Sequence, residues 1–379
     1  MRVAILTNIL APYRIKLFEE IAARVSDLTV VLMSGGHDDR HWVLPEGNFK
    51  TVLLRGASVR GPGMGEPIHF NWDALAVLRR IDPDIVVSGG FALANLCAFA
   101  YCKLFGRRYV GWAELTLRDS AERSLPRRLI RRMLISGSDA SIASSSAAVQ
   151  AFTAYGAKPG SVLLSVMPID VRRFRDGASE FRASSRFDRL RAQYSTPCLI
   201  GIGRLLDLKG HLELFAIYER ILREHADATL LVAGEGRDRE KYRELIERRG
   251  WKKVHLLGHL QEQDLIEHLA IADLFVFPTP GDAFGAVVSE ALAAGVPTVS
   301  SIHAAATYDL IEHGRTGFRI DPADIEASAE ITLQALRLGD EKRRTMIDSG
   351  YEKVRPHDFP EAAAGIVFHL KSFINPSHI

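Results

Sequence analysis

Short apolar segments rich in β-branched residues alternate with segments of helical periodicity along the whole chain. This alternation is typical of parallel βαβ units, in which a crossover helix joins each strand to the next. Helices are predicted between most of the strands, for example at 15–25, 72–81 and 145–155. The strands predicted in the first half of the chain lie at 2–7, 28–33, 50–54, 84–88, 108–112, 140–143 and 162–166.

The alternation is interrupted once. Residues 171–196 are rich in Arg, Ser and Asp and poor in aliphatic residues, and Pro197 follows them. Beyond this segment the pattern resumes, with helices predicted at 211–224 and 239–249. The strands predicted in this second series lie at 198–203, 229–233, 254–257, 274–277, 298–301 and 317–320.

We therefore predict an α/β protein with two Rossmann-like domains, which a chain of 379 residues can accommodate. The first domain comprises residues 1–170 and the second residues 197–356, with a linker or a surface helix between them at 171–196. A final helix within about 357–379 is expected to cross back to the first domain. Two such sheets facing each other would leave a cleft between the carboxyl ends of their strands, where ligands bind in open α/β folds.

Composition excludes several classes of protein. With 48 basic and 46 acidic residues the net charge is only +2, which gives no global electrostatic reason to expect a nucleic-acid partner. Three irregularly spaced cysteines predict neither a disulfide framework nor a zinc site, and they fit a reducing, cytoplasmic compartment. Residues 85–102 carry no charge, but Ser88-Gly89-Gly90 interrupts them, so we predict a strand, a glycine turn and a helix rather than a membrane span. His211, His225 and His268 are predicted at exposed helix positions.

The most informative segment runs from 278 to 297. A strand ends at 277, a proline–glycine loop follows, and a helix is predicted from near Gly285 to Gly295. Backbone N–H groups and the helix dipole at such a junction form a site for a diphosphate. Asp282 and Glu290 are eight residues apart, about 12 Å at the helical rise, which would place one carboxylate on each side of that diphosphate. There they would accept hydrogen bonds from sugar hydroxyls.

A second segment, 201–210, also ends a predicted strand. Gly201 and Gly203 allow close backbone approach, and Arg204 and Lys209 can neutralise a leaving diphosphate. Alone, this segment suits a tight turn with solvated charges equally well. Its combination with the 278–297 segment, in one Rossmann-like unit, favours a binding site.

With these motifs the chain resembles a family 4 retaining glycosyltransferase of the two-domain GT-B fold, also called glycosyl transferase group 1. The family's acidic pair corresponds to Asp282-Ala283-Phe284-Gly285 followed by Glu290 and the run to Pro297. Its Gly-Arg and Lys-Gly elements correspond to Gly203-Arg204 and Lys209-Gly210. Further matches are Gly234-Glu235-Gly236, Leu257-Gly258, Asp309-Leu310-Ile311, the segment 314–318, and Pro168-Ile169-Asp170 with Phe174.

The resemblance implies transfer of a sugar, with retention and without a metal, from a nucleotide sugar to a hydroxyl of a glycan or lipid-linked acceptor in polysaccharide or glycoconjugate biosynthesis. By resemblance, Arg204 and Lys209 would hold the diphosphate, Glu290 the ribose, and Asp282 the donor sugar. His259 suits a base contact and a surface loop equally well. The donor site implied by the resemblance comprises Gly203, Arg204, Lys209, Gly258, His259, Asp282, Ala283, Phe284, Gly285, Ala286 and Glu290.

The sequence departs from the family pattern at several positions. Asp282 is one methylene shorter than the usual Glu, and Ala304-Ala305-Ala306 stands where the family often has Gly-Gly. The loop after the first strand, residues 8–14, lacks a glycine pair. Many relatives carry a His after the fifth strand, where Glu114 is the nearest polar residue here, so we include Glu114 with Asp282, Arg204 and Lys209 among the catalytic candidates.

Two other motifs have competing interpretations. Asp82-Pro83-Asp84 resembles a metal-binding Asp-x-Asp, but the proline favours a turn before the next strand. An amphipathic helix without acidic residues is predicted within 123–134, and it suits a solvated face or attraction to anionic lipid or to a diphosphate-lipid acceptor at the inner face of the membrane. Its arginines are Arg123, Arg127, Arg128, Arg131 and Arg132.

Two alternatives to a glycosyltransferase stay open. A nucleotide-sugar epimerase of similar fold would bind the same donor without a separate acceptor. A catalytically inactive module of GT-B fold would bind a partner instead, although the set of Arg204, Lys209 and Glu290 argues against it. A dinucleotide oxidoreductase is disfavoured because no Gly-x-Gly-x-x-Gly follows the first strand.

Overall fold

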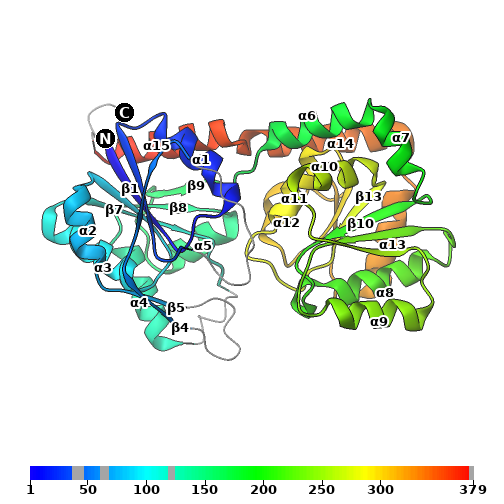
Figure 1. The fold of residues 1–379 in the computed structure, drawn as a ribbon, viewed down its shortest axis with the longest axis horizontal. Helices are drawn as coiled ribbons and strands as arrows, with labels where there is room; N and C mark the ends of the chain where they lie inside the picture. The colour runs from blue at the N-terminus through cyan, green and yellow to red at the C-terminus, as the bar shows by residue number, and fades with distance from the viewer. Residues whose placement is uncertain (36–46, 60–67, 118–123, 375–379) are drawn as a thin grey trace. The chain divides into compact units, whose positions relative to one another are not determined.

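The computed structural model describes residues 1–35, 47–59, 68–117 and 124–374. These residues form two compact units (Figure 1). The first unit comprises Met1–Pro168 together with Phe359–Ile379, and the second comprises Ile169–Asp358. The C-terminal segment therefore folds with the N-terminal unit, and the boundaries lie within two residues of the predicted 170 and 356.

The first unit is built on a seven-stranded parallel sheet of order β3-β2-β1-β6-β7-β8-β9. Its core strands are buried on both faces, because alternate residues of each strand point to opposite sides of the sheet. Helices α1 (Pro12–Ala22) and α15 (Phe359–Ser372) pack on one face. Helices α2 (Ala74–Ile81), α3 (Leu93–Phe105), α4 (Leu125–Ser136) and α5 (Ser146–Ala154) cover the other. The strands are β1 (Arg2–Thr7), β2 (Asp27–Leu32), β3 (Lys50–Leu53), β6 (Ile85–Gly89), β7 (Arg108–Ala113), β8 (Ala140–Ala143) and β9 (Val162–Leu164).

A small antiparallel pair, β4 (Gly56–Val59) and β5 (Ile68–Asn71), is inserted between β3 and α2. The sequence analysis did not predict it. All four residues of β4 are exposed, so this strand has no run of buried apolar residues by which it could be recognised. The uncharged stretch at 85–102 forms β6, a turn at Gly90 and most of α3. Among the described residues, none of the helices is long and apolar enough to span a membrane.

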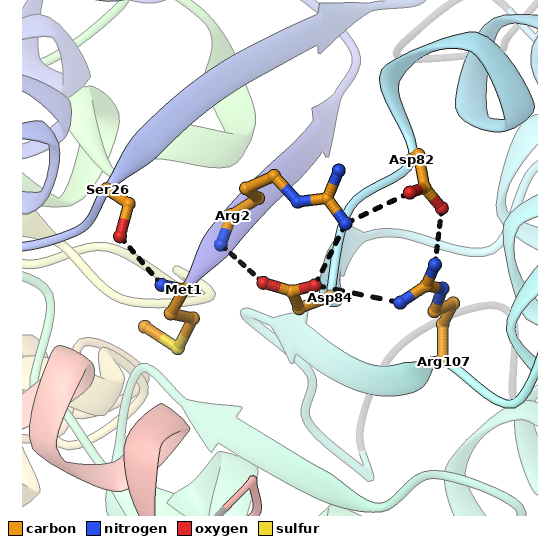
Figure 2. Close-up of polar contacts among 6 residues, drawn as sticks. All are labelled: Met1, Arg2, Ser26, Asp82, Asp84 and Arg107. Carbon is orange, nitrogen blue, oxygen red and sulfur yellow. Dashed lines mark hydrogen bonds and ion pairs between the residues drawn. The ribbon is translucent and has the colours of Figure 1, made fainter.

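Charged residues tie together the amino ends of three strands of this sheet (Figure 2). Arg2 donates from its guanidinium to Asp82 at 3.0 Å and to Asp84 at 3.2 Å, and Arg107 approaches both carboxylates. The hydrogen bond from Arg2 is the main cause of the lowered pKa of Asp82. Asp82 itself ends α2 in a left-handed conformation. The Asp82-Pro83-Asp84 motif therefore forms an ion-paired turn, and we call these four charged residues the amino-end cluster.

The second unit contains a six-stranded parallel sheet of order β12-β11-β10-β13-β14-β15. This is the doubly wound order, in which the direction of winding reverses between β10 and β13. Helices α8 (His211–Ile221), α9 (Arg239–Arg249) and α13 (Ile325–Leu336) pack over the main core. Helices α10 (Glu262–Ile271), α11 (Ala286–Ala293) and α14 (Asp340–Val354) lie on the opposite side of the sheet (Figure 1). The strands are β10 (Cys198–Ile202), β11 (Thr229–Ala233), β12 (Val254–Gly258), β13 (Leu274–Phe277), β14 (Thr298–Ser301) and β15 (Phe318–Ile320).

The segment 171–196, expected to be a linker or a surface helix between the domains, is instead part of the second unit. It forms α6 (Val171–Arg182) and α7 (Ser185–Arg191). Arg182 donates to the carbonyl oxygens of Ala270 at 3.2 Å and Ala294 at 2.9 Å. These hydrogen bonds, and the packing of α6 on α10 and α11, explain why an Arg-rich segment poor in aliphatic residues still folds onto the sheet domain.

Candidate active site

An ion pair lies where the strand order of the second sheet reverses. Lys209 is the last residue of the short helix η2 (Asp207–Lys209), in the loop that follows β10, and Asp282 lies in the loop that follows β13. The Nζ atom of Lys209 is 2.5 Å from Oδ2 of Asp282, and each side chain is less than one-fifth exposed, at 17% and 18%. The structure therefore brings together two predicted site residues from the carboxyl ends of neighbouring strands, where open α/β sheets bind ligands.

Glycines allow the backbone around this pair to pack closely. Gly210 follows Lys209 with φ of 80°, and a Cβ atom placed there would lie 2.2 Å from the carbonyl oxygen of Pro278. Gly234 has φ of 145°, and its Cβ would lie 1.9 Å from the carbonyl oxygen of Gly203. Both of these oxygens belong to the backbone and cannot rotate away from a Cβ atom. Glycine at positions 210 and 234 therefore lets the backbone segments at the strand ends pack against each other.

Several side chains hold the loop that contains Arg204 and Lys209 through hydrogen bonds. Nε2 of His211 lies 2.9 Å from the carbonyl oxygen of Arg204, and burial lowers the pKa of His211, which favours the neutral ring with Nε2–H as the donor. The carboxylate of Asp207 accepts hydrogen bonds from Tyr242 and Lys241. His211 is only 3% exposed, so its predicted exposed position was wrong. Tyr242 is fully buried and has no motif that could have revealed its contact with the loop.

Arg204 lies in the same loop, two residues after the end of β10. Its side chain is exposed, and its guanidinium forms no ion pair with any residue that the structure describes. Lys209, in contrast, already has a carboxylate partner. Of the two predicted diphosphate ligands, one is therefore available to an incoming anion and the other is held in place by Asp282.

The loop between β13 and α11 is fixed by backbone hydrogen bonds. Oδ1 of Asp282 accepts from the N–H of Phe284 at 3.2 Å, and the N–H of Ala306 donates to the carbonyl oxygen of Phe284 at 2.8 Å. Ala304 and Ala306 are fully buried against this loop. The alanines that replace the family's glycines therefore form part of the support for Asp282.

The separation of about 12 Å predicted for the two carboxylates assumed a helical rise over all eight residues. Helix α11 begins at Ala286, with Gly285 as its N-cap at φ of 91°, so Asp282 lies outside the helix. The helical rise that gave about 12 Å between the carboxylates applies only from Ala286 to Glu290. The loop conformation, and not helical spacing, determines where Asp282 points.

Glu290 is a half-buried residue in the second turn of α11. Burial raises its pKa to about 7, and the charge of Glu262 adds to the rise. Near neutral pH this carboxyl group is therefore present in both its protonated and its ionised form. Such a group can donate or accept a hydrogen bond, which suits contact with a hydroxyl.

The remaining donor-site candidates of this unit lie on the same edge of the sheet. Gly258 is buried at the end of β12 with φ of 77°, and its carbonyl oxygen accepts from the N–H of Gly234 at 2.8 Å. His259 follows it with an exposed side chain. Ala283 is also exposed, whereas Phe284 is 1% exposed and packs inward.

Glu114, the catalytic candidate of the first unit, follows β7. Its Oε1 accepts from Nη2 of Arg14 at 3.0 Å, with side chains 30% and 20% exposed. The guanidinium of Arg14 also lies 5.4 Å from the ring centroid of Trp112. Arg14 lies in the first turn of α1, at the end of the segment 8–14 that lacks a glycine pair. Its pairing with Glu114 depends on the tertiary fold and could not be inferred from that segment.

The prediction for the basic helix α4 is corrected at one arginine and is not tested at another. Arg123 lies outside the described residues. Arg131 is only 7% exposed and its guanidinium lies 5.2 Å from the ring centroid of Phe91, so it does not belong to an outward-facing patch. Arg127, Arg128 and Arg132 are exposed, as predicted for a basic surface. Within the described parts of the chain, no group of His, Cys, Asp and Glu side chains could hold a metal ion.

Comparison with known sequences finds one family model that matches part of the second unit. Residues 186–353 match the family model for glycosyl transferases group 1. A GDP-mannose-dependent monoacylated alpha-(1-6)-phosphatidylinositol monomannoside mannosyltransferase of Corynebacterium glutamicum is 30% identical over 175 residues, 44% of this chain and 45% of the relative. A glycogen synthase of Mycobacterium tuberculosis is 32% identical over 145 residues, 36% of this chain and 33% of the relative. This chain therefore covers less than half of the length of these curated relatives.

Solved structures match the whole fold. A glycosyltransferase from Rickettsia africae has a TM-score of 0.76 at 15% identity and covers 99% of each chain. Anabaena HepE in complex with UDP has a TM-score of 0.76 at 17% identity, covering 98% of this chain and 100% of the other. The predicted GT-B fold, with two Rossmann-like domains, is confirmed.

Proposed function

We propose that this chain, whose residues 186–353 match the family model for glycosyl transferases group 1, transfers a glycosyl group from a nucleotide sugar to a hydroxyl of a glycan or lipid-linked acceptor. The reaction would serve polysaccharide or glycoconjugate biosynthesis. The observation that carries this proposal is the Lys209–Asp282 pair, which lies between two loops at the reversal of the second sheet. The complex of Anabaena HepE with UDP, a structure of the same fold, supports a nucleotide-sugar donor.

The chemical requirement is to stabilise a leaving nucleoside diphosphate. As the bond between the anomeric carbon and the phosphate oxygen breaks, negative charge grows on the diphosphate. Arg204 and Lys209 supply positive charge there, and the N-terminus of α11 near Gly285 adds its dipole. These groups would do the work that a metal ion does in other transferases.

Asp282 has two tasks in this proposal. Without donor it neutralises Lys209 at 2.5 Å, so neither charge is left unpaired at a partly buried site. When a diphosphate takes over Lys209, Asp282 becomes free to accept hydrogen bonds from the donor sugar. Glu290 would bind the ribose hydroxyls, for which its pKa of about 7 is suited.

The proposed transfer retains configuration. The acceptor oxygen forms a bond to the anomeric carbon on the face that the diphosphate leaves, and the acceptor's proton passes to the leaving phosphate oxygen. In the first unit we propose Glu114, which is oriented by Arg14, as a further catalytic residue. We further place the enzyme in the cytoplasm and peripherally on the inner face of the membrane. In support, the name of the C. glutamicum relative gives a lipid-linked acceptor.

The test is a thermal-shift screen of UDP-, GDP- and ADP-sugars, followed by product analysis with and without glycan acceptors. A ligand that binds only the native state raises the melting temperature by mass action. We expect one nucleotide class to stabilise the wild type, and Lys209→Ala to lose most of that shift. The proposal fails if none of the donors stabilises the protein. Conversion of the donor sugar without any acceptor would identify an epimerase instead.

A further inference from the structure

Helix α4 and the turn before it expose large apolar side chains. Leu125, Leu129 and Met133 are 69%, 67% and 46% exposed, and their four-residue spacing places them along one face of the helix. Leu117, just upstream in the described chain, is 50% exposed. On the opposite face Leu134 and Ile135 are buried. The helix is therefore held on the first unit by one face while a second apolar face meets solvent.

The exposed face borders a groove of about 280 Å³. Its walls are formed by Leu117, Leu125, Leu129, Ala154 and Tyr155, and Arg128 and Arg132 stand beside them. We call the four exposed side chains Leu117, Leu125, Leu129 and Met133 the apolar ridge. A clustered apolar surface of this kind, bordered by charged residues, is typical of a contact site.

The charged side chains that the structure describes on α4 have one sign. Arg127, Arg128 and Arg132 are exposed and form no ion pair with any residue that the structure describes. Helix α4 contains no acidic residue at all, on a chain whose net charge is only +2. Arg131, in contrast, is turned inward onto Phe91. Of the four arginines that the structure describes on this helix, three are thus available to a partner.

We infer that this face of the first unit docks on an anionic lipid bilayer, with the apolar ridge inserted at the acyl boundary and the three arginines among the headgroups. A helix that has apolar residues on one side and arginines beside them lies in the membrane interface in this way. The inference deepens the proposed function, since a lipid-linked acceptor would lie in the same surface, but the docking itself depends on no catalytic residue.

Charge complementarity selects this occupant over a second copy of the chain. In a two-fold dimer the same patch would face itself, and the three arginines of one copy would oppose the three of its partner. An anionic bilayer supplies the opposite charge. It also supplies an apolar phase for leucines that would otherwise stay in water.

This geometry predicts two separable contributions to binding. The arginine contribution decays as salt shortens the Debye length, which falls to about 3 Å at 1 M. The contribution of the apolar ridge does not depend on salt. Binding should therefore weaken as salt rises but leave a residual fraction, whereas a purely electrostatic contact would disappear.

The test is co-sedimentation of the full chain with phosphatidylcholine vesicles, with and without phosphatidylglycerol. Arg127→Gln/Arg128→Gln/Arg132→Gln should lower binding at low salt by about 100-fold, roughly fivefold for each arginine. The matched control for this loss of charge replaces three exposed arginines of the second unit, and it should bind like the wild type. It is Arg223→Gln/Arg248→Gln/Arg344→Gln.

Leu125→Gln/Leu129→Gln should remove the residual binding at high salt, by roughly tenfold or more. Its control is Leu53→Gln/Leu104→Gln, at two other leucines of the first unit that are 56% and 72% exposed. All four variants should keep the wild-type melting temperature and the wild-type response to nucleotides, so this test stands even if the proposed reaction is wrong. The inference is overturned if the wild type ignores anionic vesicles, or if either α4 variant binds like its control. It is equally overturned if the leucine variant abolishes a dimer in solution and leaves vesicle binding intact.

Discussion

The amino-end cluster and the Lys209–Asp282 pair both join basic and acidic side chains, but they stand at opposite edges of their sheets. In the amino-end cluster, Arg2 and Arg107 each meet both carboxylates (Figure 2). Lys209 and Asp282 form a single ion pair in loops at the carboxyl edge. In the amino-end cluster each charged residue has two partners of opposite charge. Lys209 and Asp282 each have one such partner, and a ligand can take its place.

The two groups of charged residues also differ in their exposure to solvent. The side chains of the amino-end cluster are 30% to 47% exposed, and water already screens them. The Lys209–Asp282 pair is less than one-fifth exposed and is bordered by Gly210, whose missing Cβ brings the backbone of Pro278 close. Charged residues alone therefore do not identify a site. A site is identified by its position at the carboxyl ends of the strands and by how few ion-pair partners its charged residues have.

The largest expected effect comes from the pair. Lys209→Ala should lower the transfer rate by about 100-fold or more, the scale of losing one preorganised charge donor. The melting temperature should change little, because the variant also leaves Asp282 able to meet water. Lys252→Ala, at an exposed lysine in the same unit, is the control. A Lys209→Ala rate near that of the control would remove this loop from the site.

Gly210→Ala tests whether the backbone approach is needed. The added Cβ would lie 2.2 Å from a backbone oxygen at φ of 80°, so we expect a loss of about 1 to 3 kcal/mol in stability together with loss of donor binding. Gly281→Ala is the matched control in the neighbouring loop, because a Cβ there meets nothing within 4 Å. Chemical denaturation measures both. Equal stability of the two variants would show that the loop can yield.

Glu290 predicts a dependence on pH. Its folded pKa of about 7 lies above the ordinary 4.5, so ionising it costs folding free energy, and this cost grows as the pH rises from 4.5 through 7. Glu290→Gln should therefore stabilise the protein by about 1 to 3 kcal/mol at pH 8 and hardly at all at pH 4. Glu247→Gln, at an exposed position on α9, is the matched control variant. Parallel gains at both pH values would mean that burial does not penalise this carboxylate.

The smallest effect is expected in the amino-end cluster. Asp82→Asn should lower the melting temperature slightly near neutral pH and leave transfer unchanged. The pKa of Asp82 is lowered in the folded protein, so its contribution exists above the ordinary value of 3.8 and is lost as the pH falls below it. Melting curves at pH 7 and pH 3 for variant and wild type would measure this. A fall in transfer rate comparable to that of Lys209→Ala would erase the contrast between the two groups.

Sequence patterns predicted the sheets well because parallel strands are buried on both faces. Strands such as Arg2–Thr7 and Thr229–Ala233 have the predicted bounds, since an apolar run is what a doubly covered strand requires. The exposed strand β4 lacks such a run and was missed. Segment 171–196 was misjudged for a related reason, because hydrogen bonds from Arg182 to backbone carbonyls leave no hydrophobic pattern.

The candidate site was predictable as motifs but not as contacts. Glycines, Lys209 and Asp282 follow strand ends, and strand ends of one parallel sheet meet at one edge. The ion pair itself, the support from Tyr242 and the pairing of Arg14 with Glu114 all depend on residues far apart in the chain. Arg131 is another example. Its charge and its place in the helix predicted that it would be exposed with the other arginines of α4, but its contact with Phe91 turns it inward.

In the proposed site Lys209 binds the diphosphate and Asp282 binds the donor sugar, and each neutralises the other until the donor binds. Calorimetric titration with the bare nucleoside diphosphate, chosen from the donor screen, tests it directly. Asp282→Ala should bind the diphosphate as tightly as the wild type or more tightly, because Lys209 is released, while Glu290→Ala loses affinity with the ribose contact. If Asp282→Ala lost as much affinity for the nucleoside diphosphate as Glu290→Ala does, the two carboxylates would not have these separate roles.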